Sequence, residues 1–460
     1  MKKYISAILF LCFLLPMISV GQDTVKVSLE SFIERGIENS GQIEYEQRKV
    51  ALANNQINQA QARRYLPRFQ LSTQHGIVPG VKSQTNLPED EYYLDPELEN
   101  DWENWAVFSR AEVSAVQPIF AWGALKNAVK AAKSAAVAAQ KQFEKEKASL
   151  RLRLFELYQS YLLTNEILVL LDEAQNQIDK IERQIEEKQE EGDADFDESD
   201  LFKFKVFKSE FDIRAAEVRE EAEMTQRIWN YVLNAEENTV YVPDTNFLDP
   251  VAEELREIDY YRSYALANRS EIDAIEAGID AAEYGMKAQK QKNYPSLFIG
   301  LTGSYANTPN RPRQSNPFII NNSNYASGSF GFGIRQNLDF LSIQADIEKG
   351  RIQYRQAKYL KDAAVDGIVL EINQAYKETS LSKVKVDKTD EAHVTSKQWL
   401  RQEQLDYDFG MGDTKDLVDA MKKELELRVQ LKREIFNFNN NIAELYRKSG
   451  LQILELSNQN

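Results

Sequence analysis

Cysteine is almost absent from this sequence, and the single one, Cys12, lies in an apolar run over residues 8–15. Two lysines precede that run, and Ser19 and Gly21 follow it with the spacing of a cleavage site. This order predicts a secretory signal peptide over residues 1–21. Its removal would leave a chain without thiols, which excludes disulfides and cysteine-bound metals.

Histidine is scarce as well, and this limits the catalytic chemistry that the chain can support. His75 falls in an alternating stretch and His393 in a helical one, and neither has a partner at the spacing of a metal site or a catalytic triad. The sequence has no glycine-rich phosphate loop and no nucleophile motif. It therefore predicts neither an enzyme nor a bound cofactor or metal, and both histidines are expected at the surface.

Two further absences concern partners. Acidic residues outnumber basic ones, so the net charge is −16, and it becomes −18 when the two lysines of the leader are removed. A chain of this sign is poorly suited to bind nucleic acid. After residue 22 the sequence has no run of about 18 apolar residues, the length that a membrane helix needs. Insertion into a membrane would therefore have to use β-strands.

Proline and glycine are missing from two long segments. No proline occurs between Pro118 and Pro243 or after Pro317, and no glycine occurs between Gly123 and Gly192. Apolar residues in these segments recur at steps of three, four and seven, which indicates coiled-coil packing. The first segment predicts a helix of roughly 68 residues and ~100 Å, far longer than a typical globular helix.

Four stretches of another kind alternate apolar with polar or small residues. Alternation over roughly ten residues, with Trp105 and Tyr305 near the ends, is typical of outer-membrane strands. An amphipathic strand in a soluble sheet has the same period, and the length of the stretches favours the membrane interpretation. The linkers over residues 77–104 and 307–324 are expected to be exposed loops. The predicted strands span residues 69–76, 105–117, 296–306 and 326–338.

The chain contains an internal repeat. Residues 39–71 parallel residues 268–301, and in both copies a helical stretch ends at a proline, Pro67 or Pro295, before a strand. Each copy continues with a second strand and a long helical hairpin. The predicted first repeat covers residues 22–250, with a strand pair over 68–118, a hairpin over 123–240 and its tip near 192–200. The second covers residues 251–449, with a strand pair over 296–338, a hairpin over 342–449 and its tip near 407–416, and a tail follows over 450–460.

These motifs resemble those of the TolC family of outer-membrane efflux proteins, also called outer membrane factors. The resemblance rests on the repeated segments that contain "YLPRFQL" and "NYPSLFIGL", on the two glycine turns and on "YDFGMGDTKDLVDA", and it extends over residues 29–451. It implies a mixed α and β fold, in which long antiparallel coiled-coil helices form an α-barrel. Four strands from each of three subunits would join one twelve-stranded β-barrel. Four strands alone cannot close a barrel, which needs at least about eight.

The resemblance also implies a location, partners and a function. The chain would lie in the lipid of the cell outer membrane with a large periplasmic portion. As a homotrimer it would work with a periplasmic adaptor (membrane fusion) protein and an inner-membrane pump. It would be the exit duct of a tripartite efflux or type I secretion system, gated at its periplasmic tip. Drugs, metal ions and polypeptides would all meet a polar tunnel, so the choice of cargo is expected to lie largely with the pump.

A non-conducting coiled-coil protein that tethers or scaffolds the envelope is the alternative function. Such a tether needs long helices, which this sequence predicts. It needs neither paired strands nor a duplicated strand pair and hairpin, and both are predicted here. These two features therefore favour the duct.

The stretch "YDFGMGDTKDLVDA" marks the predicted second hairpin tip. Gly410 is expected to end one helix there, and Asp413 or Thr414 is expected to cap the next. Asp416 falls in the first turn of that next helix, where the helix dipole favours a carboxylate. By resemblance to the family, Asp416 and Asp419 line the constriction of the pore.

The resemblance assigns further roles at the two tips. Tyr407 would help to hold the tip shut, with Asp200 of the first hairpin as its partner. Gly192 and Gly410 would mark the two tip turns, which are expected to dock the adaptor. The chain departs from the best-known members at Gly412, where they have an arginine. This departure leaves open whether a latch that depends on this arginine is intact here.

Overall fold

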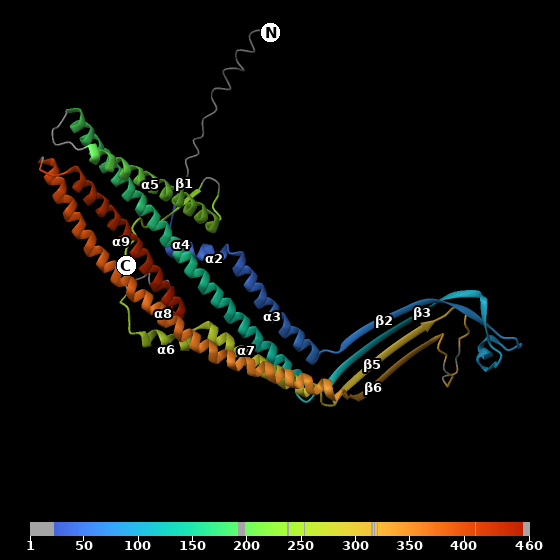
Figure 1. Ribbon diagram of the computed structural model, residues 1–460. Coiled ribbons are helices and arrows are strands. Elements are labelled where there is room, and N and C mark those ends of the chain that lie inside the picture. Colours follow the sequence, from blue (N-terminus) through green and yellow to red (C-terminus); the bar gives the residue numbers. More distant parts are fainter. Residues whose placement is uncertain are drawn as a thin grey trace, which may run out of the picture. The chain divides into compact units, whose positions relative to one another are not determined.

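The computed structural model of the protein describes residues 23–191, 198–236, 239–252, 254–313, 316, 318–319, 321–409 and 411–453 (Figure 1). The predicted signal peptide lies outside these ranges. The chain divides into two compact units, each described here by itself. Unit 1 takes the described parts of Met1–Gln47, Phe143–Ile272 and Ala364–Asn460, and unit 2 takes Arg48–Gln142 and Asp273–Ala363. Each unit thus draws on both predicted repeats, and the division into repeats stays a prediction.

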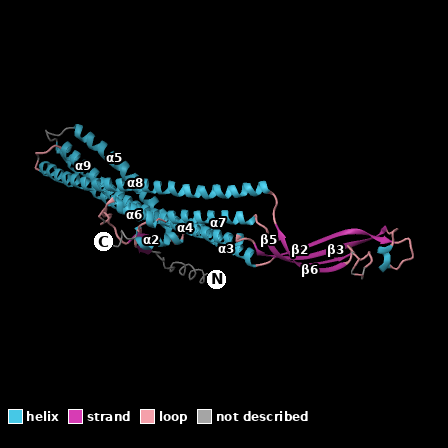
Figure 2. Cartoon of the chain, turned by 90° about the horizontal axis from the view of Figure 1, so that it is seen from below, coloured by secondary structure: helices cyan, strands magenta, loops and turns pink. Residues whose placement is uncertain are grey.

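Unit 2 contains a four-stranded antiparallel sheet, which Figure 2 shows in magenta. The strands are β2 (Arg68–Lys82), β3 (Glu99–Phe120), β5 (Ser296–Asn307) and β6 (Tyr325–Arg335), and their order in the sheet is β2-β3-β5-β6. All four coincide with stretches in which apolar and polar residues alternate. The period of two gives the sheet one apolar and one polar face.

The register of the sheet places its apolar residues in rows across the strands. One row joins Phe69, Ala115, Leu301 and Phe330, each paired with its neighbour on the next strand. Three of these four side chains are at least half exposed. The adjacent row on the other face joins Ser114, Thr302 and Ser329. The apolar face of the sheet is therefore uncovered in the single chain.

The first predicted loop is shorter than the sequence suggested. Residues 77–104 are not all loop, because β2 continues to Lys82 and β3 begins at Glu99, with Ile77 paired to Val107. The ladder continues past a register shift between Pro79 and Gly80, which the sequence pattern did not reveal. Only residues 83–98 remain outside the strands, and they include the short 3₁₀-helix η1 (Glu89–Leu94).

The second linker packs onto the first strand pair instead of standing free in solvent. The side chain of Asn310 donates hydrogen bonds to the carbonyl oxygens of Val78 and Asn104, at 3.3 and 2.7 Å. The guanidinium of Arg311 donates to the carbonyl oxygen of Pro79 at 3.1 Å. Side-chain donors of the second linker thus bond to carbonyl groups beside the register shift.

Unit 1 begins with elements that the sequence analysis missed. The strands β1 (Asp23–Val27) and β4 (Thr239–Pro243) form a parallel two-stranded sheet. The helix α2 (Leu29–Glu38) follows β1 and is capped by the Ser28 hydroxyl, which accepts from the Ser31 amide. Phe32 of this helix stacks on the fully buried Trp229, with ring centroids 4.3 Å apart. This aromatic pair fixes the N-terminal segment on the core of the unit.

Long helices make up most of the described chain. The helix α4 (Ala124–Glu191) has 68 residues, as the segment without glycine or proline predicted. The helix α8 (Phe340–Asp408) has 69, and it tolerates two internal glycines. None of the described helices is apolar enough over 18 residues to cross a membrane. The remaining helices are α3 (Gly41–Tyr65), α5 (Glu198–Leu233), α6 (Ile258–Asn268), α7 (Ser270–Lys292) and α9 (Thr414–Ser449).

Two hydrophobic clusters hold the helices of unit 1 together. The first surrounds Trp229 and Phe32 and includes Ile442 and Leu445 of α9. The second joins α4, α5 and α9 near the tip turn that connects α8 to α9. On α4 its members Leu171, Ile178 and Ile185 are seven residues apart. The heptad pattern in the sequence therefore corresponds to a buried helix face.

Candidate functional site

The turn between α8 and α9 is built by backbone hydrogen bonds and one cap. The carbonyl oxygen of Asp406 accepts from the amides of Met411 and Gly412, at 2.8 and 2.9 Å. Asp413 caps α9, because its side chain accepts from the Lys415 amide at 3.0 Å. Of the two predicted caps, Asp413 and Thr414, the structure selects Asp413. Gly410 and Gly192 lie outside the described residues, so their predicted turn roles stay predictions.

Gly412 sits where a side chain has no room. A Cβ atom at this position would lie 2.7 Å from the Tyr407 amide nitrogen and 3.0 Å from the Asp406 carbonyl carbon. Both neighbours are backbone atoms of the last turn of α8, which cannot rotate away. A residue with a side chain could be placed here only if the backbone of the turn changed.

We expect Gly412→Ala to destabilise the turn by about 1–3 kcal/mol, because the added methyl group must displace helix backbone. The thermal unfolding temperature of the purified protein should fall. Met411→Ala, a change at the neighbouring exposed residue, is the matched control and should leave it nearly unchanged. Equal unfolding temperatures for both variants would contradict the tight packing at Gly412.

Asp416 and Asp419 lie on one face of the first turns of α9, and both are exposed. The residues between and beside them, Leu417, Val418 and Ala420, are buried in the opposite direction. Residues three apart on a helix are neighbours, so the two carboxylates form one acidic surface. The predicted pair is therefore brought together on solvent-facing helix surface.

Tyr407 is placed differently from these two aspartates. Its side chain is only 4% exposed and belongs to the second hydrophobic cluster, with Leu417 and Met421 of α9. The aromatic ring thus joins the end of α8 to the start of α9. The side chain of its predicted partner, Asp200, lies outside the described part of the chain. The pairing of the two residues remains a prediction.

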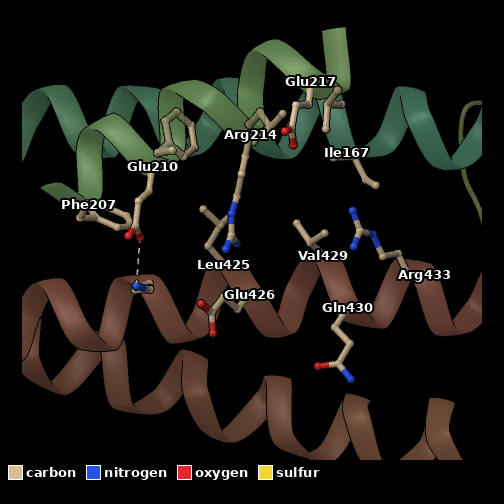
Figure 3. A pocket seen from close by; sticks show the side chains of 14 residues that line it. Ile167, Phe207, Glu210, Arg214, Glu217, Leu425, Glu426, Val429, Gln430 and Arg433 are labelled. Atoms are coloured by element: carbon tan, nitrogen blue, oxygen red, sulfur yellow. Dashed lines mark hydrogen bonds and ion pairs between the residues drawn. The ribbon is translucent and has the colours of Figure 1, made fainter. Parts of the chain in front are cut away.

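Next to this cluster lies a groove that sequence reasoning did not find. Its volume is about 550 Å³, and Figure 3 shows it between α5 and α9 with part of α4 behind. One ion pair crosses it, from Lys422 Nζ of α9 to Glu210 Oε2 of α5 at 3.4 Å. The only signal in the sequence was that charged residues share a helix face with heptad apolar ones. The groove is lined by Ile167, Leu171, Phe207, Glu210, Phe211, Arg214, Glu217, Val218, Lys422, Leu425, Glu426, Val429, Gln430 and Arg433.

Further polar contacts attach α9 to its neighbours. Arg428 contacts Glu173 of α4 at 3.1 Å. His393 of α8 lies 3.4 Å from Glu424 of α9, and its side chain is largely buried. The expectation of a surface histidine was therefore wrong at this position, because α9 covers most of the side chain. Among the residues that the structure describes, no group of three histidine, cysteine or acidic side chains gathers as metal ligands.

One carboxyl group of α4 has a shifted pKa. Partial burial, and then the neighbouring Glu444 carboxylate, raises the pKa of Glu156 above its ordinary value of 4.5. The folded chain therefore binds the Glu156 proton more tightly than the unfolded chain does. Its contribution to stability is complete below pH 4.5 and is lost as the pH rises through the folded pKa.

We therefore expect Glu156→Gln to raise the thermal unfolding temperature at pH 7 and to change it little at pH 4. The amide removes a partly buried negative charge beside Glu444 while keeping the shape of the side chain. Glu220→Gln, at an exposed position on α5, is the control. An equal effect of Glu156→Gln at both pH values would contradict the raised pKa.

Comparisons with known proteins agree with this architecture. Residues 262–447 match the family model "Outer membrane efflux protein". Among solved structures the chain is similar to CusC, with 15% identity, a TM-score of 0.73 and 93% of each chain covered. It is also similar to the CmeC outer membrane channel of Campylobacter jejuni (15% identity, TM-score 0.71, 92% of this chain and 86% of that chain). The open MtrE outer membrane channel of Neisseria gonorrhoeae gives 14% identity, a TM-score of 0.71, and 92% and 89% coverage.

These findings bear on the resemblance inferred from the motifs. A search of curated proteins found no match. The family match confirms the resemblance to outer-membrane efflux proteins and lies within the second predicted repeat. At these identities the likeness to solved structures shows the fold, and it does so over more than nine-tenths of the chain.

Proposed function

We propose that this chain, whose residues 262–447 are an outer membrane efflux protein domain in a channel fold, is an outer-membrane exit duct of an efflux system. One observation carries the proposal: the four-stranded sheet has an exposed apolar face and a polar face. An apolar outer face against lipid and a polar inner face are what a membrane-embedded strand requires. The long helices would form the large periplasmic portion.

Three copies would complete the structure. The edge strands β2 and β6 each lack a partner on one side within the described chain, and an open edge cannot remain in lipid. Twelve strands from three copies exceed the minimum of about eight for a barrel. Exposed apolar residues also line helices of unit 1, including Phe202, Val206 and Ile213 on α5 and Leu370 and Leu381 on α8. Neighbouring copies would cover them.

The purified protein is therefore expected to be a detergent-extracted trimer, which light scattering or native mass spectrometry would measure. The double change Leu370→Glu and Leu381→Glu should shift it toward monomers, because charges would enter an apolar contact. Lys385→Glu, an exposed change on the same helix, is the control and should keep the trimer. A monodisperse monomer of the unchanged protein in detergent-free buffer would contradict the assembly.

The gate of the duct would be the tip turn. In a threefold assembly Asp416 and Asp419 would form two rings of carboxylates around the axis, and Tyr407 would hold α8 and α9 together behind them. The tip turns would be the docking place of a periplasmic adaptor, which would connect the duct to an inner-membrane pump. The cargo would be selected by that pump.

Conductance in a planar lipid bilayer tests this function. A purified trimer that is a duct should give discrete ion-conducting steps after insertion. A protein that only tethers the envelope should insert without conducting, and this outcome would replace the duct by the tether. Boiled protein at the same detergent concentration provides the control for detergent leaks.

A further inference from the structure

The segment that joins the two halves of the chain crosses both hairpins in unit 1. We call residues 244–251, which follow β4, the strap. Most of it is exposed, but the Leu248 side chain is 0% exposed and belongs to the first hydrophobic cluster. At its start, the Asp244 carboxylate accepts a hydrogen bond from the Tyr158 hydroxyl of α4 at 2.8 Å. The Asp244 amide also donates to the Val27 carbonyl oxygen of β1 at 3.1 Å. Further along, the strap is attached at two polar junctions.

The first junction is centred on Glu166 of α4. Its carboxylate accepts from the Leu248 amide of the strap at 2.7 Å and contacts Lys432 Nζ of α9 at 2.5 Å. The same ammonium group donates to the Leu248 carbonyl oxygen at 3.4 Å. Glu166 is buried, and a buried carboxylate is stable only when paired and hydrogen-bonded as it is here. The strap, α4 and α9 are thus joined through one ion pair.

The second junction is centred on Asn439 of α9, which is 1% exposed. Its Oδ1 accepts from the Val251 amide at 2.9 Å. Its Nδ2 donates to the Asp249 carbonyl oxygen at 2.9 Å and to Gln159 Oε1 of α4 at 3.0 Å. Both donors and an acceptor of one amide are therefore used, and no other side chain of this size offers that set.

The spacing of the two junctions fixes the register of the helices. Gln159 and Glu166 are seven residues apart on α4, and Lys432 and Asn439 are seven apart on α9. Seven residues are two helical turns, so each pair lies on one face. A slip of α9 along α4 by one turn, about 5.4 Å, would break both junctions together and leave buried polar groups unpaired.

On the tip side of Lys432, α9 is held in another way. There it faces the groove of Figure 3, where the ion pair from Lys422 to Glu210 joins side chains that are about half exposed. Such surface pairs contribute little to stability. The remaining contacts of Leu417 and Met421 are apolar, and apolar contacts are not directional. Arg428 forms a second partly exposed pair with Glu173 of α4 at 3.1 Å, and the buried carboxylate of Glu424 contacts His393 of α8. Together with α8, this part of α9 can therefore shift against α4 and α5 without breaking any buried hydrogen bond that the structure describes.

We propose that the two junctions are a clamp that keeps α9 in register with α4 while the tip-side part of α9 moves when the gate opens. Asn439 and Glu166 are then positioning residues that act on the gate through α9. The proposal rests on the proposed gated duct, and it adds a fixed point to it. Movement would be confined to the part of α9 from Thr414 to about Arg428.

The first test compares Asn439→Leu with Asn437→Leu in planar bilayers. Asn437 is exposed on the same helix, so the control makes the same chemical change outside the junction. We expect Asn439→Leu trimers to open at least about tenfold more often, since lost buried hydrogen bonds of this kind change equilibria by that order. Their cation selectivity should not change, because Asp416 and Asp419 are intact. Wild-type open probability in assembled Asn439→Leu trimers would overturn the clamp.

The second test needs no change at the junction. Hydrogen exchange is measured for the wild-type trimer and for Tyr407→Ala, which removes a ring that is packed between α8 and α9 and is expected to loosen the tip. The amides of Leu248 and Val251 should stay equally protected in both, while those of Met411 and Gly412 should exchange at least about tenfold faster in the variant. Loss of protection at Leu248 and Val251 together with the tip would overturn the clamp, including when Asn439→Leu does not assemble.

A milder variant separates the two contacts of the first junction. Glu166→Gln keeps an acceptor for the Leu248 amide and removes the charge that pairs with Lys432. It is expected to give an open probability between those of wild type and Asn439→Leu. An open probability equal to that of wild type would show that Glu166 is not part of the clamp. A wild-type trimer without conductance would overturn the duct itself. A conducting wild type with unprotected Leu248 and Val251 amides would overturn the clamp alone.

Discussion

Ile299→Arg is expected to reduce assembly of the trimer strongly, whereas Thr302→Arg is expected to be tolerated. Ile299 lies on the apolar face of the sheet, where β6 places Phe332 opposite it. Thr302 lies on the polar face between Ser114 and Ser329. An arginine that faces lipid near the middle of a bilayer costs ~2–4 kcal/mol, and one that faces a water-filled interior costs much less.

The yield of trimer in outer-membrane fractions, measured on native gels, would report this difference. The two positions are three residues, or about 10 Å, apart on the same strand. Thr302 is the nearer to the middle of β5, so a difference in depth alone would make Thr302→Arg the more costly change. Ile299→Lys should behave like Ile299→Arg, because the cost arises from the charge. Equal yields for Ile299→Arg and Thr302→Arg would show that this face of β5 does not meet lipid.

The double change Asp416→Ala and Asp419→Ala is expected to remove most of the cation selectivity of the resting pore and its block by multivalent cations. Rings of carboxylates at a constriction attract cations and repel anions. In the single chain both side chains are exposed on one helix face, so their removal breaks no buried contact. The trimer should therefore remain nearly as stable as the unchanged protein. Reversal potentials in a salt gradient and titration with a trivalent cation would measure the two properties.

Tyr407→Phe provides the contrast to the aspartate pair. Its ring is buried between α8 and α9, and its hydroxyl is predicted to pair with Asp200 of the first hairpin. Loss of the hydroxyl should therefore loosen the tip and raise conductance without changing selectivity. Asp259→Ala, at an exposed aspartate of α6 with no place near the tip turn, is a control for the general loss of a negative charge. If removal of both aspartates left ion selectivity and cation block unchanged, the two residues would not line the pore constriction. The role of Asp416 would then be limited to the helix dipole in the first turn of α9.

Local features of the sequence determined the long helices and the strands. The absence of glycine and proline between Gly123 and Gly192 predicted α4 to within one residue at each end, because a helix continues until a residue that disfavours it appears. The alternation in four stretches predicted all four strands of the sheet, because side-chain direction in a strand depends only on position along the chain. The cap at Asp413 was also predictable, since capping involves residues two or three apart.

Only the tertiary structure decided which distant residues meet. The pairing of β1 with β4 joins segments more than two hundred residues apart, and five-residue strands carry no distinctive period. Gly412 is required because of the backbone of Tyr407 and Asp406, a closeness that follows from how the turn folds. Asn439, Glu166 and the strap came together from three separate segments. In the sequence Asn439 and Glu166 are ordinary polar residues of helices. They become junctions only because packing removes the surrounding water and leaves each of them one set of hydrogen-bonding partners.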